Sequence, residues 1–324
     1  MEKAGIRFVE GGDEAITILY YSNADPAEPW REAFARELPR IPFRVWPDSG
    51  PLESVRYALV WKPPRGFLAQ FPNLKAILAL GAGVDPIPTD PALPTGVPLL
   101  RLVDVGFPAQ MAEYAMCAVL RFQRRIGEIE ALQRQARWNQ LDPFFIRDFP
   151  VGVMGLGVIG AVVAQRLAAA GYAVAGWARS PKRLGGVEVF AGSEAFKKFL
   201  SRSRVVVNAL PLTPLTENIL DAAAFAAMPR GGYVVNIGRG AHVVDRDLIA
   251  ALDSGQLAGA MLDVFREEPL PSSHPFWRHP KIAVTPHVAA PTIASEVQPQ
   301  VIENIRRLER GDPPIGLVDI ARGY

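Results

Sequence analysis

One ten-residue segment constrains the fold of this chain more than any other. Residues 151–160 read VGVMGLGVIG, an apolar run followed by a turn with Gly155 and Gly157 and by the start of an apolar helical pattern. In such strand–turn–helix units the first glycine permits a tight turn and the second lets the backbone approach a pyrophosphate, while a third, here Gly160, lets helix and strand pack closely. The segment predicts a parallel α/β sheet with a dinucleotide at the turn, although glycine turns that only pack a helix on a strand are also common.

The rest of the chain alternates short apolar runs with helical patterns, which is typical of parallel sheets covered by helices. At 324 residues the chain exceeds the usual size of a single domain, so we expect two. A long helix and a second helix are predicted between residue 108 and Trp138, and a last helix over 292–310, with a kink or break at Pro299. Strands are predicted at 16–21, 43–46, 57–61, 74–80, 151–154, 173–177, 205–210, 233–237, 258–262 and 282–285.

Composition excludes several classes of partner. The chain is 49% hydrophobic and 21% charged, as in ordinary globular proteins, and its net charge is only +2. We therefore expect binding neither to nucleic acid nor to a membrane. The first residues carry charges and no apolar segment of a secretory signal, so no cleavage is expected. The single cysteine, Cys117, permits no internal disulfide; we expect a cytoplasmic protein, with Cys117 buried on an apolar helix face.

The segment after the 173–177 run bears on which dinucleotide binds. An NAD site usually places an acidic residue about 20 positions after the glycines, to bond the ribose. Here residues 178–183 read ARSPKR, so cations stand where the acid would be. They suit the 2′-phosphate of NADP(H), with NAD(H) still possible; the alternative is a solvated basic turn. The predicted dinucleotide contacts are Gly155, Leu156, Gly157, Val158, Ile159, Gly160, Arg179, Ser180, Lys182 and Arg183.

Three chemically competent side chains each follow a predicted strand near the end of the chain. Arg239 follows 233–237 in NIGRG, Glu268 lies in LDVFREEPL, and His287 closes TPH. Because the carboxyl ends of parallel strands meet at one edge, the three should share one cleft. The planar fork of arginine suits a carboxylate, and an imidazole kept protonated by a nearby carboxylate can give a proton to a carbonyl oxygen.

The other histidines, His242, His274 and His279, match no motif and are expected at the surface or in loops. No pair or cluster among the four histidines and the single cysteine has the spacing of metal ligands, so no metal is expected.

Four more motifs occur in a fixed order: LVWKPP at 59–64, LGAGVD at 80–85, QMAEY at 110–114 and TPHVAAPT at 285–292. With the motifs above, they make nearly the whole chain resemble the D-isomer-specific 2-hydroxyacid dehydrogenases, and within that family the A-type glyoxylate/hydroxypyruvate reductases. The resemblance implies reduction of a small 2-keto acid by NAD(P)H. By this likeness Arg239 grips the substrate, His287 donates the proton and Glu268 pairs with His287.

The resemblance also implies further contacts. Asp263 is similar to the residue that holds the nicotinamide carboxamide, and the glycine-bounded loop at 81–83 offers backbone N–H groups to a carboxylate. Trp61 would limit substrate size, unless it is a core or hinge residue. The other cofactor contacts are Pro211, Thr213, Ile237, Gly238 and His287, and the substrate contacts are Trp61, Ala82, Gly83, Arg239 and Trp138.

The implied architecture is two Rossmann-like doubly wound parallel-sheet domains. The coenzyme domain, 103–287, is inserted into a flavodoxin-like substrate domain made of 1–102 and 288–324. A helical arm at about 108–149 would join two copies as a homodimer, because Met111, Met116, Leu120 and Phe122 are more apolar surface than one helix can hide. Trp138 would reach the partner's active site or, alternatively, pack within its own subunit. Two other readings stay open: a non-catalytic dinucleotide-sensing or corepressor-like protein, and a reductase of bulkier 2-keto acids or another substrate such as formate or phosphonate.

Overall fold

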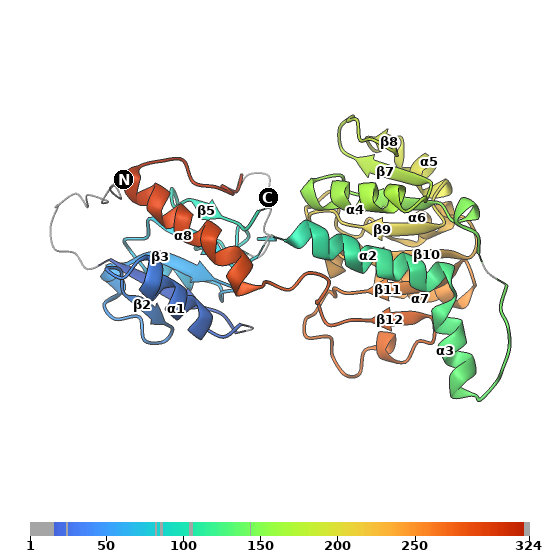
Figure 1. Cartoon of the computed structure of the whole chain (residues 1–324), viewed down its shortest axis with the longest axis horizontal. Helices are drawn as coiled ribbons and strands as arrows, with labels where there is room; N and C mark the ends of the chain where they lie inside the picture. The colour runs from blue at the N-terminus through green and yellow to red at the C-terminus, as the bar shows by residue number, and fades with distance from the viewer. Residues whose placement is uncertain are drawn as a thin grey trace, which may run out of the picture. The chain divides into compact units, whose positions relative to one another are not determined.

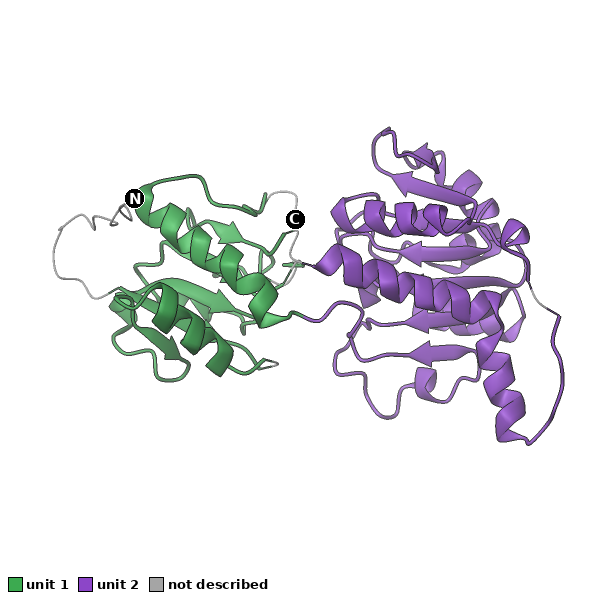
Figure 2. Ribbon diagram, viewed as in Figure 1, with its two compact units in different colours: residues 1–105, 292–324 green, residues 106–291 purple. Residues whose placement is uncertain are grey.

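The computed structural model describes residues 16–23, 25–81, 83–84, 87–103, 106–142 and 144–320. The chain forms two compact units: residues 1–105 with 292–324 make unit 1, and residues 106–291 make unit 2 (Figure 2). Each unit is built on a parallel sheet, and unit 2 is inserted into unit 1 (Figure 1). The predicted fold class is confirmed.

Unit 1 has a five-stranded sheet in the order β2-β1-β3-β4-β5. Its central strands are mostly apolar and, apart from the half-buried Arg56 in β3, buried, as expected of parallel strands covered on both faces. Helix α8, from the far end of the chain, packs beside α1 and so completes the unit. Its elements are β1 (Thr17–Tyr21), α1 (Glu28–Glu37), β2 (Phe43–Val45), η1 (Leu52–Ser54), β3 (Val55–Val60), η2 (Leu68–Gln70), β4 (Ala76–Ala79), β5 (Leu99–Leu100) and α8 (Ala294–Arg310).

Helix α8 runs unbroken through Pro299, where a kink or break was expected from the sequence. Proline removes one backbone hydrogen bond from a helix interior, at a cost of about 3 kcal/mol. The buried face of α8, which includes Val297, Val301 and Ile305, holds the helix against its unit on both sides of the proline.

Unit 2 has a seven-stranded sheet in the order β12-β11-β10-β9-β6-β7-β8. Its strands are β6 (Val151–Met154), β7 (Val174–Ala178), β8 (Val187–Ala191), β9 (Val205–Asn208), β10 (Gly232–Asn236), β11 (Leu257–Leu262) and β12 (Ile282–Val284). Its helices are α2 (Phe107–Gln123), α3 (Ile126–Arg134), η3 (Ile146–Asp148), α4 (Val158–Ala169), α5 (Phe196–Ser201), α6 (Ala222–Ala227), η4 (Gly240–His242), α7 (Asp245–Asp253) and η5 (Pro275–Trp277).

Alternate strand residues bury against two separate helical layers. On β9, Val205 and Val207 pack with residues of α2 and α4, whereas Val206 packs with residues of α5, α6 and α7. In the view of Figure 1, α2 and α4 lie in front of the sheet. This two-sided packing leaves the carboxyl ends of the strands, and the loops that follow them, as the place for a site.

Helix α2 belongs to the core of unit 2, which corrects two expectations. Its residues Ala112, Ala115, Val119 and Phe122 follow helical spacing and are buried, so Phe122 is not exposed apolar surface as predicted. Cys117 was expected to be buried but is exposed, because it lies on the other face of this helix.

Candidate active site

The glycine turn has the geometry that a dinucleotide requires. Gly155 has φ +88°, and a Cβ there would lie 2.9 Å from the carbonyl oxygen of Ala209, so only glycine fits the turn. A Cβ on Gly160 would lie 1.7 Å from the carbonyl oxygen of Gly155, because α4 packs directly on the turn. A Cβ on Gly157 would meet nothing within 4 Å, which leaves its backbone, at the start of α4, open to an anion.

The basic segment after β7 folds back onto this turn. The Lys182 ammonium donates a hydrogen bond of 2.6 Å to the carbonyl oxygen of Leu156, within the glycine turn. Arg179, Ser180 and Arg183 are exposed around it. The segment is therefore anchored at the dinucleotide turn, with its other polar groups open to a ligand.

His287 and Glu268 form a pair. Nδ1 of His287 lies 2.8 Å from Oε2 of Glu268, and Oε1 of Glu268 accepts a hydrogen bond from the Phe265 backbone N–H at 3.0 Å. The two side chains are 34% and 20% exposed, so the pair is neither sealed in the core nor fully solvated. Because Nδ1 faces the carboxylate, Nε2 is the nitrogen that can deliver a proton to a substrate.

Asp263 organises the turn that carries His287. It is buried at the end of β11, and its carboxylate accepts hydrogen bonds from the Thr285 hydroxyl at 2.6 Å and from the backbone of Val288 and Ala289 at 2.9 Å. His287 itself has φ +56°, an unfavourable region for a residue with a side chain. These bonds hold the strained backbone in place, and a role for Asp263 in nicotinamide binding stays a prediction.

A tyrosine extends this support to α2. The Tyr114 hydroxyl lies 2.6 Å from Oγ1 of Thr285, and because the Thr285 proton goes to Asp263, Tyr114 is the donor. Burial raises the pKa of Tyr114, so the phenol stays protonated and keeps donating. The His287 turn is thus tied to a helix of the core.

The backbone of Arg239 is held by buried polar side chains. Its carbonyl oxygen accepts from Nδ2 of Asn236 at 2.9 Å, and its N–H donates to Nδ1 of His242 at 3.1 Å. His242 was expected at the surface or in a loop, but its ring is fully buried, because the single turn of η4 brings it back beneath Arg239. Asn208 joins the same cluster from the end of β9. The sequence contains a signal for this buried polar cluster, because two apolar strands each end in an asparagine, Asn208 and Asn236.

The loops after β10 and β11 touch directly. A Cβ on Gly240 would lie 1.8 Å from the carbonyl carbon of Phe265, so the backbones that carry Arg239 and Glu268 meet at this glycine. Arg266 adds to the contact by donating to the carbonyl oxygens of Ala241 at 3.2 Å and Val243 at 2.5 Å.

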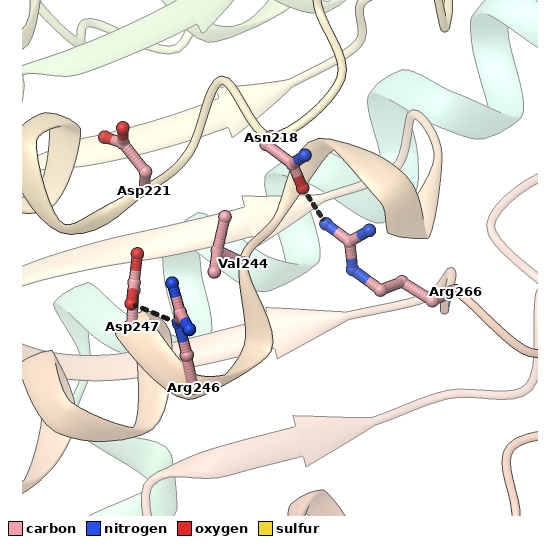
Figure 3. Close-up of a pocket in the computed structure, with 6 residues that line it drawn as sticks. All are labelled: Asn218, Asp221, Val244, Arg246, Asp247 and Arg266. Carbon is pink, nitrogen blue, oxygen red and sulfur yellow. Dashed lines mark hydrogen bonds and ion pairs between the residues drawn. The ribbon is translucent and has the colours of Figure 1, made fainter.

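Arg266 also lines a polar pocket of about 470 Å³ (Figure 3). Its guanidinium points to Asn218, and Arg246 pairs with the adjacent Asp247 at 3.3 Å on another part of the lining (Figure 3). Burial raises the pKa of neighbouring Asp245, and the nearby Arg266 and His274 side chains offset part of that rise. The lining residues are Asn218, Asp221, Val244, Arg246, Asp247 and Arg266, so the pocket does not include the catalytic candidates. The charges of this pocket largely satisfy one another, since Arg246 pairs with Asp247 and Arg266 with Asn218.

Similarity to known proteins agrees with this geometry. The family described as D-isomer specific 2-hydroxyacid dehydrogenase, NAD binding domain, matches residues 116–289. A glyoxylate/hydroxypyruvate reductase A from Serratia proteamaculans is 46% identical over 314 residues, which is 95% of this chain and 100% of the relative. The chain belongs to the D-isomer specific 2-hydroxyacid dehydrogenase family.

Solved structures of other dehydrogenases of this family have the same fold. One from Xanthobacter autotrophicus Py2, in complex with NADPH and MES, has a TM-score of 0.89 and 44% identity, covering 96% of this chain and 100% of that one. An NADPH-dependent glyoxylate/hydroxypyruvate reductase from Sinorhizobium meliloti, in complex with NADP and sulfate, has a TM-score of 0.89 and 36% identity, covering 95% and 100%.

The remaining predicted site residues of this dehydrogenase fall in different places. In unit 1, Trp61 follows β3 and lies against Gly81, where a Cβ would be 2.4 Å from Cζ3 of the indole. Gly83 is half-buried, and Ala82 lies outside the described residues. In unit 2, Trp138 is 97% exposed and so does not pack within its own unit.

The last predicted cofactor contacts are all in unit 2. Val158 and Ile159 begin α4, Pro211 and Thr213 form the loop after β9, and Ile237 and Gly238 follow β10. In the described parts of both units, no group of three or more histidine, cysteine, aspartate or glutamate side chains is arranged to hold a metal. None of the helices described is long and apolar enough to cross a membrane.

Proposed function

We propose that this dehydrogenase reduces a small 2-keto acid, glyoxylate or hydroxypyruvate, to the 2-hydroxy acid with NADPH. The observation that carries the proposal is the His287–Glu268 pair, 2.8 Å apart, in a chain that also has the open glycine turn. The relatives named for glyoxylate and hydroxypyruvate reduction cover 95% of the chain and support the substrate class.

In this proposal Arg239 binds the substrate carboxylate and carbonyl, because its guanidinium can donate two parallel hydrogen bonds. The reduced nicotinamide supplies the hydride when bound. His287, held through Nδ1 by Glu268, gives the proton from Nε2 to the carbonyl oxygen as negative charge develops there. Transfer from a positioned acid of this kind contributes typically about 10²- to 10⁴-fold to a rate.

The cofactor would lie on unit 2, its pyrophosphate at Gly157 and the start of α4. The exposed Arg179 and Ser180, with Lys182 anchored to the glycine turn, suit the 2′-phosphate of NADP(H). The NADPH and NADP complexes of related structures support this preference. Unit 2 would be the coenzyme domain and unit 1 the substrate domain, where Trp61, Ala82 and Gly83 would contact the substrate.

We also propose a homodimer and a cytoplasmic location. Four large apolar side chains on α3 or between α3 and β6 are exposed, as expected of a surface that another copy covers: Ile129, Trp138, Phe145 and Ile146. A chain with one cysteine forms no internal disulfide and suits a reducing compartment that supplies NADPH.

The test is steady-state kinetics with glyoxylate, hydroxypyruvate, pyruvate, 2-ketoisocaproate and phenylpyruvate, each with NADPH and with NADH. We expect the two small substrates with NADPH to give the highest kcat/KM. His287→Ala should lower kcat at least about 100-fold while NADPH still binds. His279→Ala is the matched control, because His279 precedes β12 and so lies at the amino end of the strand whose carboxyl end leads to His287. Near-normal kcat in His287→Ala would refute its role.

A further inference from the structure

The imidazole of His242 connects two parts of the site. It is fully buried, and Nδ1 receives hydrogen bonds from the Arg239 backbone at 3.1 Å and from Nδ2 of Asn208 at 2.8 Å. Nε2 lies 3.3 Å from the carbonyl oxygen of Pro211. Because Nδ1 accepts, the ring proton is on Nε2 and is donated to Pro211.

The tautomer is further determined by the buried asparagines. Nδ2 of Asn208 also donates to Oδ1 of Asn236, and Oδ1 of Asn208 accepts from the Leu210 backbone, so the Asn208 amide can be oriented in only one way. Its Nδ2 must then present a proton to Nδ1 of His242. If the ring proton were on Nδ1, the Nδ1–H would point at two other donors, the Asn208 amide and the Arg239 N–H, and no hydrogen bond could form.

The two ring nitrogens therefore serve two different ligands of the proposed reaction. Nδ1 supports the backbone of Arg239, which binds the keto acid. Nε2 supports Pro211, in the loop that the family likeness assigns to the cofactor. Rigid support of this kind keeps binding groups within the small tolerance that catalysis demands.

We infer that His242 is a positioning residue that couples the keto-acid site, through Nδ1 and Arg239, to the cofactor loop, through Nε2 and Pro211. The inference rests on the proposed function, because it takes Arg239 and Pro211 as substrate and cofactor contacts. His242 touches neither ligand itself.

Two amide variants separate the two connections. In His242→Asn the side-chain oxygen can take the place of Nδ1 and accept from Arg239, but the side chain is too short to reach Pro211. In His242→Gln the amide nitrogen can take the place of Nε2 and donate to Pro211, but no acceptor remains at the position of Nδ1. A buried neutral hydrogen bond contributes about 1 kcal/mol, which converts to about a fivefold change in a binding constant.

The experiment measures the Kd of NADPH by fluorescence titration and the KM of glyoxylate at saturating NADPH. We expect His242→Asn to raise the Kd of NADPH about fivefold and to leave the KM of glyoxylate within twofold. His242→Gln should raise the KM of glyoxylate about fivefold and leave the Kd of NADPH within twofold. His279→Asn and His279→Gln are matched controls that should change neither constant.

Equal shifts of both constants in both variants would show a merely structural role and overturn the inference, as would no shift in either. If the variants do not fold, ¹⁵N NMR of the histidines in the unmutated protein replaces them: a neutral His242 with its proton on Nδ1 refutes the inference, and a proton on Nε2 supports it. If the unmutated protein binds NADPH but reduces no keto acid, the proposed function fails instead.

Discussion

Replacing Gly157 by alanine should separate dinucleotide binding from folding. A Cβ at this position meets nothing within 4 Å, and the backbone has φ −71° and ψ −165°, which alanine adopts without strain. The fold can therefore accommodate the extra methyl group without a steric clash. A pyrophosphate that approaches the Gly157 backbone would meet it directly.

The magnitudes follow from the position of Gly157 just before α4. Alanine reduces the conformational freedom of the unfolded chain, which stabilises the folded protein by about 0.4–1 kcal/mol. As an N-cap residue, however, alanine is less favourable than glycine by a similar amount. The free energy of unfolding should thus change by less than about 0.5 kcal/mol. Loss of one charged hydrogen bond to phosphate costs about 1.5–3 kcal/mol, which is about 10- to 150-fold in the Kd of NADPH.

The assay combines chemical denaturation with fluorescence titration of NADPH. Gly185→Ala is the matched control, because a Cβ at Gly185 also meets nothing within 4 Å and the residue is exposed beyond β7. Gly160→Ala is the opposite case: its Cβ would lie 1.7 Å from the Gly155 carbonyl oxygen, so it should lose stability as well as binding. An unchanged Kd in a folded Gly157→Ala protein would refute the placement of the pyrophosphate.

Four further predictions concern specificity and assembly. Arg179→Ala should reduce the preference for NADPH over NADH by about tenfold or more, since a charged hydrogen bond is lost; equal kcat/KM for the two cofactors in the unmutated enzyme would contradict the role of Arg179. Light scattering at micromolar concentration should show a dimer, and a monomer would contradict the proposed assembly. Trp138→Ala should change the substrate profile, and an unchanged profile would show that Trp138 does not reach the partner's active site. Trp61→Ala should raise kcat/KM for phenylpyruvate relative to glyoxylate, because the enzyme would lose about 1–3 kcal/mol of discrimination between the two substrates. An unchanged ratio would show that Trp61 is a packing residue.

Local sequence patterns were sufficient for most of the unit 2 sheet. The run at 151–154 was predicted with the bounds of β6, because a buried parallel strand is a continuous apolar run closed by a glycine turn. Strand β8 (Val187–Ala191) was missed, because it lies at the sheet edge, is mostly half-exposed and contains Glu188. The two-residue β5 was too short to leave any periodicity.

The surface of α2 shows where pattern alone misleads. Phe122 and Cys117 both lie on this apolar helix, and the sequence gives no direction for the core. Phe122 is buried, and its ring stacks on that of Tyr233 in β10 at 4.5 Å between centroids, whereas Cys117 is exposed. The expected surface for a second copy therefore consists mainly of Trp138 and its exposed neighbours, and less of helix α2 itself.

By itself, the sequence determined the fold class, the glycine turn and the chemical types of Arg239, Glu268 and His287, because backbone propensity and side-chain chemistry are local properties. The tertiary structure alone decided that His242 is buried beneath Arg239 and that Gly240 meets the loop of Glu268. These contacts join the ends of β9, β10 and β11, segments far apart in the chain. Only the order and register of strands in the sheet bring such segments within hydrogen-bonding distance, and no local pattern encodes that order.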